Sequence, residues 1–135
     1  MSFEELIKSA LEFVELAFRK FEEGVKENSS TRLRDSAEKT WNAVAQAINA
    51  LVLRYEELMP RSHYERRHAL KELEKKIPKL KDYGIYDRYA ARSCLLHGEV
   101  FYGGIIDTEL LKLELEKPRE LVEYISKNLS RFQKT

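Results

Sequence analysis

The sequence has little that would interrupt helices or cross-link the chain. Its 135 residues include five glycines, three prolines and a single cysteine, Cys94. One cysteine excludes an internal disulfide and fits a reducing compartment, while the scarcity of glycine and proline predicts long helices. No apolar run is long enough to span a membrane, and the acidic start of the chain differs from a signal peptide. We therefore expect a cytoplasmic protein without a membrane span.

Several motifs that carry chemistry are also missing. The sequence has no phosphate-cradling glycine loop, no nucleophile elbow and no paired carboxylates. Cys94 and His97 form one C-x-x-H pair, but no second pair follows that would complete a zinc site. We therefore expect no metal and no cofactor.

The residues that are present favour a bundle of helices. The composition is 43% hydrophobic and 35% charged, which suits one domain over residues 1–135. Apolar residues recur at steps of three and four, which is typical of amphipathic helices. The pattern predicts main helices over residues 3–27, 32–58 and 85–97 and from 107 or 108 to about 132, with a shorter helix over 62–76. The predicted fold is all-α: an up-and-down helical bundle of four main helices plus short extra helices.

Turn and breaker residues set the expected connections. The polar stretch 28–31 joins the first two helices into an antiparallel αα-hairpin. We expect Pro118 to interrupt the last helix, because a proline inside a helix removes a hydrogen bond. Gly98, Gly103 and Gly104 predict a loop directly after His97.

The net charge of +1 is unevenly distributed. Residues 61–92 contain ten basic and five acidic residues, a net +5. Such a patch could attract a polyanion. The alternative is a solvated helix surface with Glu–Lys pairs.

The most suggestive motif is Arg92-Ser93-Cys94-Leu95-Leu96-His97, followed by Gly98. Arginine holds phosphate through a planar fork of donors, and histidine moves protons near neutral pH. On a continuous helix these two residues would lie about 140° apart, so a break at Gly98 is needed to let both reach one phosphate. The alternative is structural: a helix-terminal histidine and an arginine paired with a nearby carboxylate. Eleven arginines and three histidines make this spacing frequent by chance.

The other candidates have simpler expected roles. We expect Cys94 and Trp41 in the core and His63 and His68 on the surface. The aromatic residues near the motif could stack on bases, although packing beneath a loop is the simpler role; they are Tyr83, Tyr86, Tyr89, Phe101 and Tyr102.

The context of the motif resembles the signature of the HEPN superfamily, helical bundles with an R-x4–6-H motif late in the chain. Within it, residues 37–51 and 97–103 are similar to blocks of the archaeal PaREP1/PaREP8 family. Ser93 stands where active HEPN members often carry Asn, Asp or His, and Glu99 stands where some toxins carry tyrosine.

The resemblance implies a function class. Many HEPN proteins are metal-independent ribonucleases of toxin–antitoxin and defence systems. By resemblance, His97 would deprotonate a ribose 2′-hydroxyl and Arg92 would hold the scissile phosphate, with Arg88, Ser93, Glu99 and Tyr102 as candidate binding residues. The implied partners are a second copy of the chain, RNA or a nucleotide, and a nucleotidyltransferase or antitoxin. The alternative is a non-catalytic dimeric helical module for protein interaction.

Overall fold

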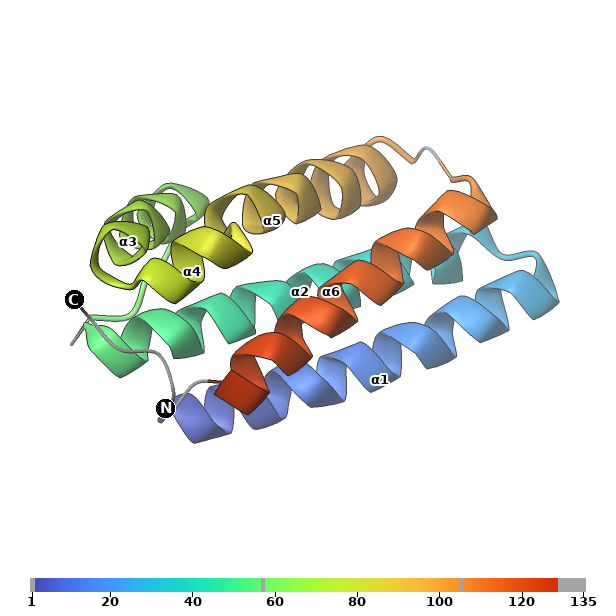
Figure 1. Ribbon diagram of the computed structural model, residues 1–135. Coiled ribbons are helices and arrows are strands. Elements are labelled where there is room, and N and C mark those ends of the chain that lie inside the picture. Colours follow the sequence, from blue (N-terminus) through green and yellow to red (C-terminus); the bar gives the residue numbers. More distant parts are fainter. Residues whose placement is uncertain (1, 57, 105, 129–135) are drawn as a thin grey trace.

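A computed structural model describes residues 2–56, 58–104 and 106–128, apart from the side chains of Phe101 and Tyr102. Within these residues the fold is all-α, as predicted, with no strand. The elements are α1 (Phe3–Glu27), α2 (Ser30–Tyr55), α3 (His63–Lys76), α4 (Pro78–Tyr83), α5 (Ile85–Arg92), the π-helix η1 (Ser93–Tyr102) and α6 (Thr108–Asn128). The long helices α1, α2 and α6 lie side by side, and α3, α4, α5 and η1 lie across the other side of α2 (Figure 1).

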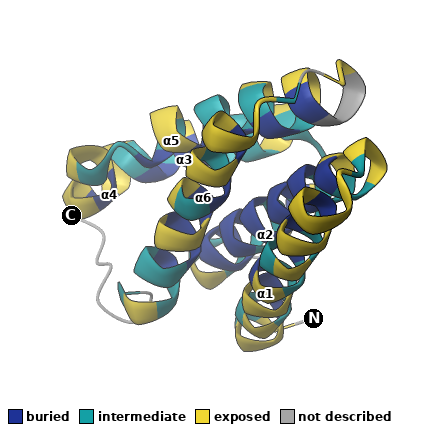
Figure 2. Cartoon of the chain, turned by 90° about the vertical axis from the view of Figure 1, so that its right-hand side faces the viewer, coloured by how far each residue is buried: buried dark blue, intermediate teal, exposed yellow. Residues whose placement is uncertain are grey.

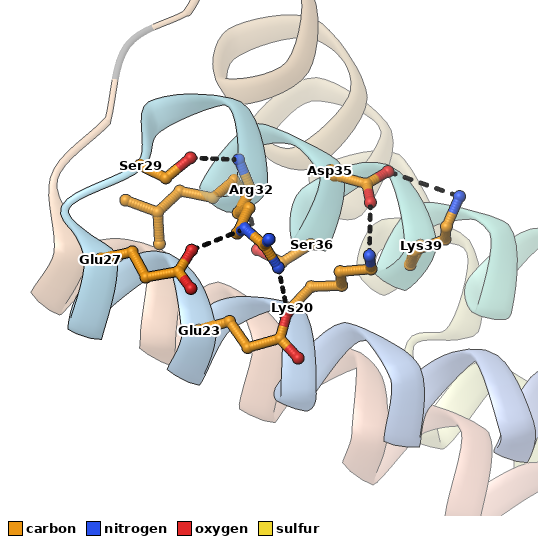
Figure 3. A network of polar contacts seen from close by, with 9 residues as sticks. Lys20, Glu23, Glu27, Ser29, Arg32, Asp35, Ser36 and Lys39 are labelled. Carbon is orange, nitrogen blue, oxygen red and sulfur yellow. Dashed lines mark hydrogen bonds and ion pairs between the residues drawn. The ribbon is translucent and has the colours of Figure 1, made fainter.

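The predicted αα-hairpin of α1 and α2 is confirmed. Asn28 ends α1 in the left-handed conformation at φ 52°, and the Ser29 hydroxyl caps α2 by accepting the Arg32 backbone N–H at 3.3 Å. Arg32 also pairs with two α1 carboxylates, Glu23 and Glu27, the latter at 2.8 Å from Nε to Oε2 (Figure 3). These contacts fix the register of the two helices at their connection.

The core forms where the small residues of α2 meet the other helices. Ala43, Ala47 and Ala50 are fully buried, as expected for a close helix contact. Larger apolar side chains from α1, α3, α5 and α6 surround them, and the buried sides of α1 and α2 face each other (Figure 2). Tyr89 of α5 and Trp41 of α2 complete this core on the α3 side.

Gly98 does not end the helix, so the predicted loop after His97 is wrong. The chain continues from α5 into η1, where hydrogen bonds of the i→i+5 kind occur, such as Gly103 N–H to the Gly98 carbonyl at 2.9 Å. Gly104, at φ 68°, is where the chain leaves helical geometry. A glycine breaks a helix only where its backbone needs a conformation that other residues avoid, and Gly98 lies within η1 without a positive φ.

Pro118 does not interrupt the last helix either. It lies buried inside α6, which is continuous to Asn128. The predicted end near Phe132 lies outside the described residues. Proline costs a helix about 3 kcal/mol, and here the packing of the flanking residues Leu115, Leu121 and Val122 in the core offsets that cost.

Other expectations need correction at single residues. Helix α2 ends at Tyr55, so Leu58 is not part of its apolar stripe and is 81% exposed. Cys94 is exposed, because it lies two residues from both Arg92 and Leu96 and so on the opposite side of the helix from these buried residues. Trp41 is buried, as predicted.

Gly98, inside η1, and Gly103, directly after it, give a direct test of this geometry. A Cβ on Gly103 would lie 2.6 Å from the Glu99 carbonyl oxygen, whereas one on Gly98 would meet nothing closer than 3.9 Å. We expect Gly103→Ala to destabilise the protein by about 1–3 kcal/mol through this overlap. Gly98→Ala should be neutral or stabilise by up to ~1 kcal/mol, because alanine favours helix. Urea unfolding followed by circular dichroism measures both, and equal destabilisation would contradict the continuous η1.

Candidate functional site

The predicted residues Arg92 and His97 contact different helices. Arg92 ends α5 and its side chain is 8% exposed, with Nη2 at 2.9 Å from Oε2 of Glu114 on α6. His97 lies inside η1 with its side chain one-quarter exposed, and its Nδ1 is 3.3 Å from Oε2 of Glu38 on α2. The structure therefore pairs each residue with its own carboxylate.

Arg92 and Glu114 form a buried ion pair. The 2.9 Å contact lacks the angle of a hydrogen bond, and among the described atoms Arg92 Nε and Glu114 Oε2 have no hydrogen-bond partner. Burial lowers the pKa of Arg92; Glu114 opposes this shift, and the neighbouring Arg88 adds to it. The pair connects α5 to α6, which is the structural alternative that the sequence left open for this arginine.

The remaining predicted binding residues do not surround His97. Arg88 lies on the α6 side, where its Nε donates to the Tyr83 carbonyl at 2.8 Å and its guanidinium covers the Tyr83 ring, which stacks on Tyr124. Glu99 is exposed and lines a pocket between η1 and α6 that Glu114 also lines.

Ser93 and Tyr102 are the two remaining predicted residues. Ser93, at the start of η1, is half-buried. The Tyr102 side chain lies outside the part that the structure describes. The residues named from sequence are therefore spread over more than one side of the α5–η1 helix.

His97 belongs to a cluster of rings that the sequence did not predict. Its imidazole stacks on Trp41 with centroids 5.5 Å apart, and the His63 ring lies 5.3 Å away. His63 is in the first turn of α3, 5.0 Å from Trp41, and its Nδ1 lies 3.1 Å from the Tyr89 hydroxyl. The expectation that His63 is a surface residue is therefore wrong: it is half-buried in this cluster, whereas His68 is exposed as expected.

Arg66, one turn further along α3, also contacts this cluster. Its Nε donates to the Tyr89 hydroxyl at 2.8 Å, and its Nη1 donates to Asn49 Oδ1 at 3.5 Å. Burial lowers the pKa of His63, and the neighbouring Arg66, His97 and Arg67 lower it further. His63 is thus held neutral near pH 7. The sequence signal was the +5 segment, which contains His63, Arg66 and Arg67.

Chemically, the cluster suits proton transfer beside an anion. A carboxylate next to one imidazole nitrogen fixes the tautomer and directs proton transfer to the other nitrogen. Among the described residues, no three His, Cys, Asp or Glu side chains gather as a metal ion would require. None of the described helices has the length and apolar character that a bilayer crossing needs.

One known protein family matches most of this chain. The model of the archaeal PaREP1/PaREP8 family matches residues 7–122, which include α2, α3, α5 and η1. The chain belongs to this family. No curated protein and no solved structure gives a significant match. In this PaREP1 protein, the matched region contains Glu38, His63 and His97 of the ring cluster as well as the Arg92–Glu114 pair.

The buried ion pair gives a testable energetic prediction for this PaREP1 protein. Arg92→Met leaves the Glu114 carboxylate buried without a counter-charge and should destabilise the fold by about 3–5 kcal/mol. Arg92→Met with Glu114→Leu removes both charges and should recover most of that loss. Urea unfolding of both single variants and the double variant measures the coupling. Additive losses would show that the two side chains do not form a coupled pair.

Proposed function

We propose that this protein is a HEPN-like RNA-interacting protein that cleaves RNA without a metal, with His97 as the general base. The observation that supports it is the His97–Glu38 contact of 3.3 Å, in which a carboxylate orients a partly exposed imidazole. Glu38 and His97 both lie within residues 7–122, the range that matches the PaREP1/PaREP8 family model.

The proposed reaction is a transesterification within RNA. With Nδ1–H directed at Glu38, His97 takes the proton of a ribose 2′-hydroxyl at Nε2. The 2′-oxygen then bonds to the adjacent phosphorus while the bond from phosphorus to the 5′-oxygen breaks. That leaving oxygen takes up a proton, which His97 returns through water. The products are a 2′,3′-cyclic phosphate and a free 5′-hydroxyl, and no oxidant or cofactor is consumed.

The setting of His97 supports this proposal in two further ways. It lies in a π-helix, a geometry that is rare in proteins overall but occurs often at functional sites. It also faces α3, whose Arg66 and Arg67 supply positive charge beside the imidazole pair. Cations next to a base favour the binding of a phosphodiester and its developing negative charge.

The test is cleavage of a labelled single-stranded RNA in the presence of EDTA. We expect cleavage by the unaltered protein and a loss of about 10²–10⁴-fold in rate in His97→Ala, the usual contribution of a general base. Glu38→Gln should give a smaller loss, because its amide still contacts Nδ1. His68→Ala is the matched control, since His68 is exposed on α3 and stacks on Tyr64 instead. The proposal is wrong if His97→Ala cleaves as fast as the unaltered protein or if no RNA is cleaved.

A second candidate function is a non-catalytic dimeric helical module. Its support is an apolar groove between the end of α2 and α3, lined in part by Val52, Met59, Pro60 and Tyr64. Leu58 and Tyr64 are 81% and 69% exposed there. Contiguous exposed apolar residues favour contact with another chain.

Size-exclusion chromatography with light scattering tests the dimer at micromolar concentration. We expect a dimer for the unaltered protein and a shift toward monomer for Leu58→Asp, because the charge would be buried in an apolar contact. Leu113→Asp, at an exposed position of α6, is the matched control. A clean monomer for the unaltered protein contradicts this candidate.

A further inference from the structure

The first turn of α3 places two side chains toward His97. His63 and Arg66 are three residues apart on this helix, so they share a face. Arg66 Nη2 lies 3.4 Å from His63 Nδ1, and the His63 ring lies 5.3 Å from the His97 ring. A guanidinium and two imidazoles, each partly exposed, therefore meet beside the stacked Trp41.

The hydrogen-bond partners determine where the His63 proton lies. Arg66 can only donate, so its Nε–H occupies the Tyr89 oxygen at 2.8 Å. Arg66 Nη2, which also can only donate, lies 3.4 Å from His63 Nδ1, and the Tyr89 hydroxyl can donate to the same nitrogen at 3.1 Å. Because Nδ1 accepts, neutral His63 carries its proton on Nε2 and presents a donor there.

The two imidazoles therefore have opposite tautomers. His97 carries its proton on Nδ1, toward the Glu38 carboxylate, and would accept a proton at Nε2. His63 is a donor at Nε2. One ring suits the removal of a proton, and the other suits the stabilisation of an oxygen that gains negative charge.

The charges around the pair favour an anion on the α3 side. Arg66 and Arg67 act on His63 from α3, and Glu38 contacts His97 from α2. Tyr89 of α5 contacts both Arg66 and His63, and burial raises its pKa, so it remains a neutral hydroxyl. The Glu38 carboxylate thus contacts His97 at Nδ1, while the donors of His63 and Arg66 come from α3.

We propose that His63 and Arg66, rather than Arg92, form the phosphate-binding half of the site, with the scissile phosphodiester of RNA as ligand. The proposal rests on the proposed ribonuclease activity and assigns its oxyanion contacts. Arg66 donates from its Nη groups and His63 from Nε2 to the non-bridging oxygens, while His97 takes the 2′-hydroxyl proton. Arg92, 8% exposed against Glu114, instead holds the helix that carries His97.

Trp41 gives a direct readout, because it is the only tryptophan in the chain and contacts both histidines. Inorganic phosphate is titrated into the full-length protein while tryptophan fluorescence is recorded, and the ¹H–¹³C NMR signals of His63 and His97 are followed in parallel. A 2′-O-methyl oligoribonucleotide, which keeps its phosphates but has no 2′-hydroxyl, is then titrated in the same way. We expect a saturable response to both probes, weakening as salt is added.

Three variants locate the anion contact. Arg66→Gln should weaken phosphate and oligonucleotide binding at least about tenfold, the loss expected for a charge-assisted hydrogen bond. Arg66→Lys, which keeps the charge but not the fork, should lie between Arg66→Gln and the unaltered protein. Arg61→Gln, with the same change in net charge at an exposed position just before α3, is the matched control and should bind as the unaltered protein does.

The outcomes separate this inference from the proposed function. Arg66-dependent phosphate binding without RNA cleavage would refute the ribonuclease and leave the phosphate site standing. His97-dependent cleavage with unchanged binding and rate in Arg66→Gln and Arg66→Lys would overturn the phosphate site and leave the ribonuclease standing. The phosphate site is also overturned if phosphate shifts neither the Trp41 nor the His63 signals of the unaltered protein. It is likewise overturned if Arg66→Gln binds phosphate and the oligonucleotide normally while Arg92→Met/Glu114→Leu does not.

Discussion

The close packing around the alanine-rich helix α2 is the constraint on which this fold depends. Among the described elements, α1, α3, α5, η1 and α6 all contact α2, and Ala43, Ala47 and Ala50 allow neighbouring helices to approach closely. The same helix contributes Glu38 and Trp41 to the ring cluster. A single rigid helix therefore sets both the core and the carboxylate and aromatic surface against which His97 lies.

The sequence predicts the main helices and their connection well, because apolar periodicity and capping are local properties. The stripes of α1 and α2 and the caps at Ser2 and Ser29 recur in the structure. The failures, at Gly98 and Pro118, have one cause. Both were judged as breakers by residue type, yet Gly98 keeps helical geometry in η1, and Pro118 is held in α6 by its buried neighbours. Gly98 keeps a negative φ that any residue adopts, whereas Pro118 is held by tertiary packing that no local pattern reports.

Only part of the candidate site could be predicted from the sequence, because its contacts join residues that are far apart in the chain. Spacing identified Arg92 and His97 because they are five residues apart. Glu38 is 59 residues from His97, and Arg66 is 23 residues from Tyr89, so pairings of this kind need the fold before they can be named. Two signals did point toward them: the family-like block 37–51 contains Glu38 and Trp41, and the +5 segment contains His63 and Arg66. Neither signal specifies a partner, since each describes one helix at a time.

The structure also explains how Arg92 can support His97 without contacting the same group. A buried ion pair with Glu114 anchors the end of α5 to α6, and the π-helix that starts at the next residue presents His97 to α2 and α3 on another side. A general base must keep its contact with the carboxylate that orients it. An exposed helix end would not keep the imidazole in place. In this chain the arginine upstream of the histidine pairs with α6 and the histidine contacts α2, so that one helical segment joins a structural anchor to the proposed base. A short arginine–histidine motif is thus compatible with phosphate chemistry even where the arginine itself is buried.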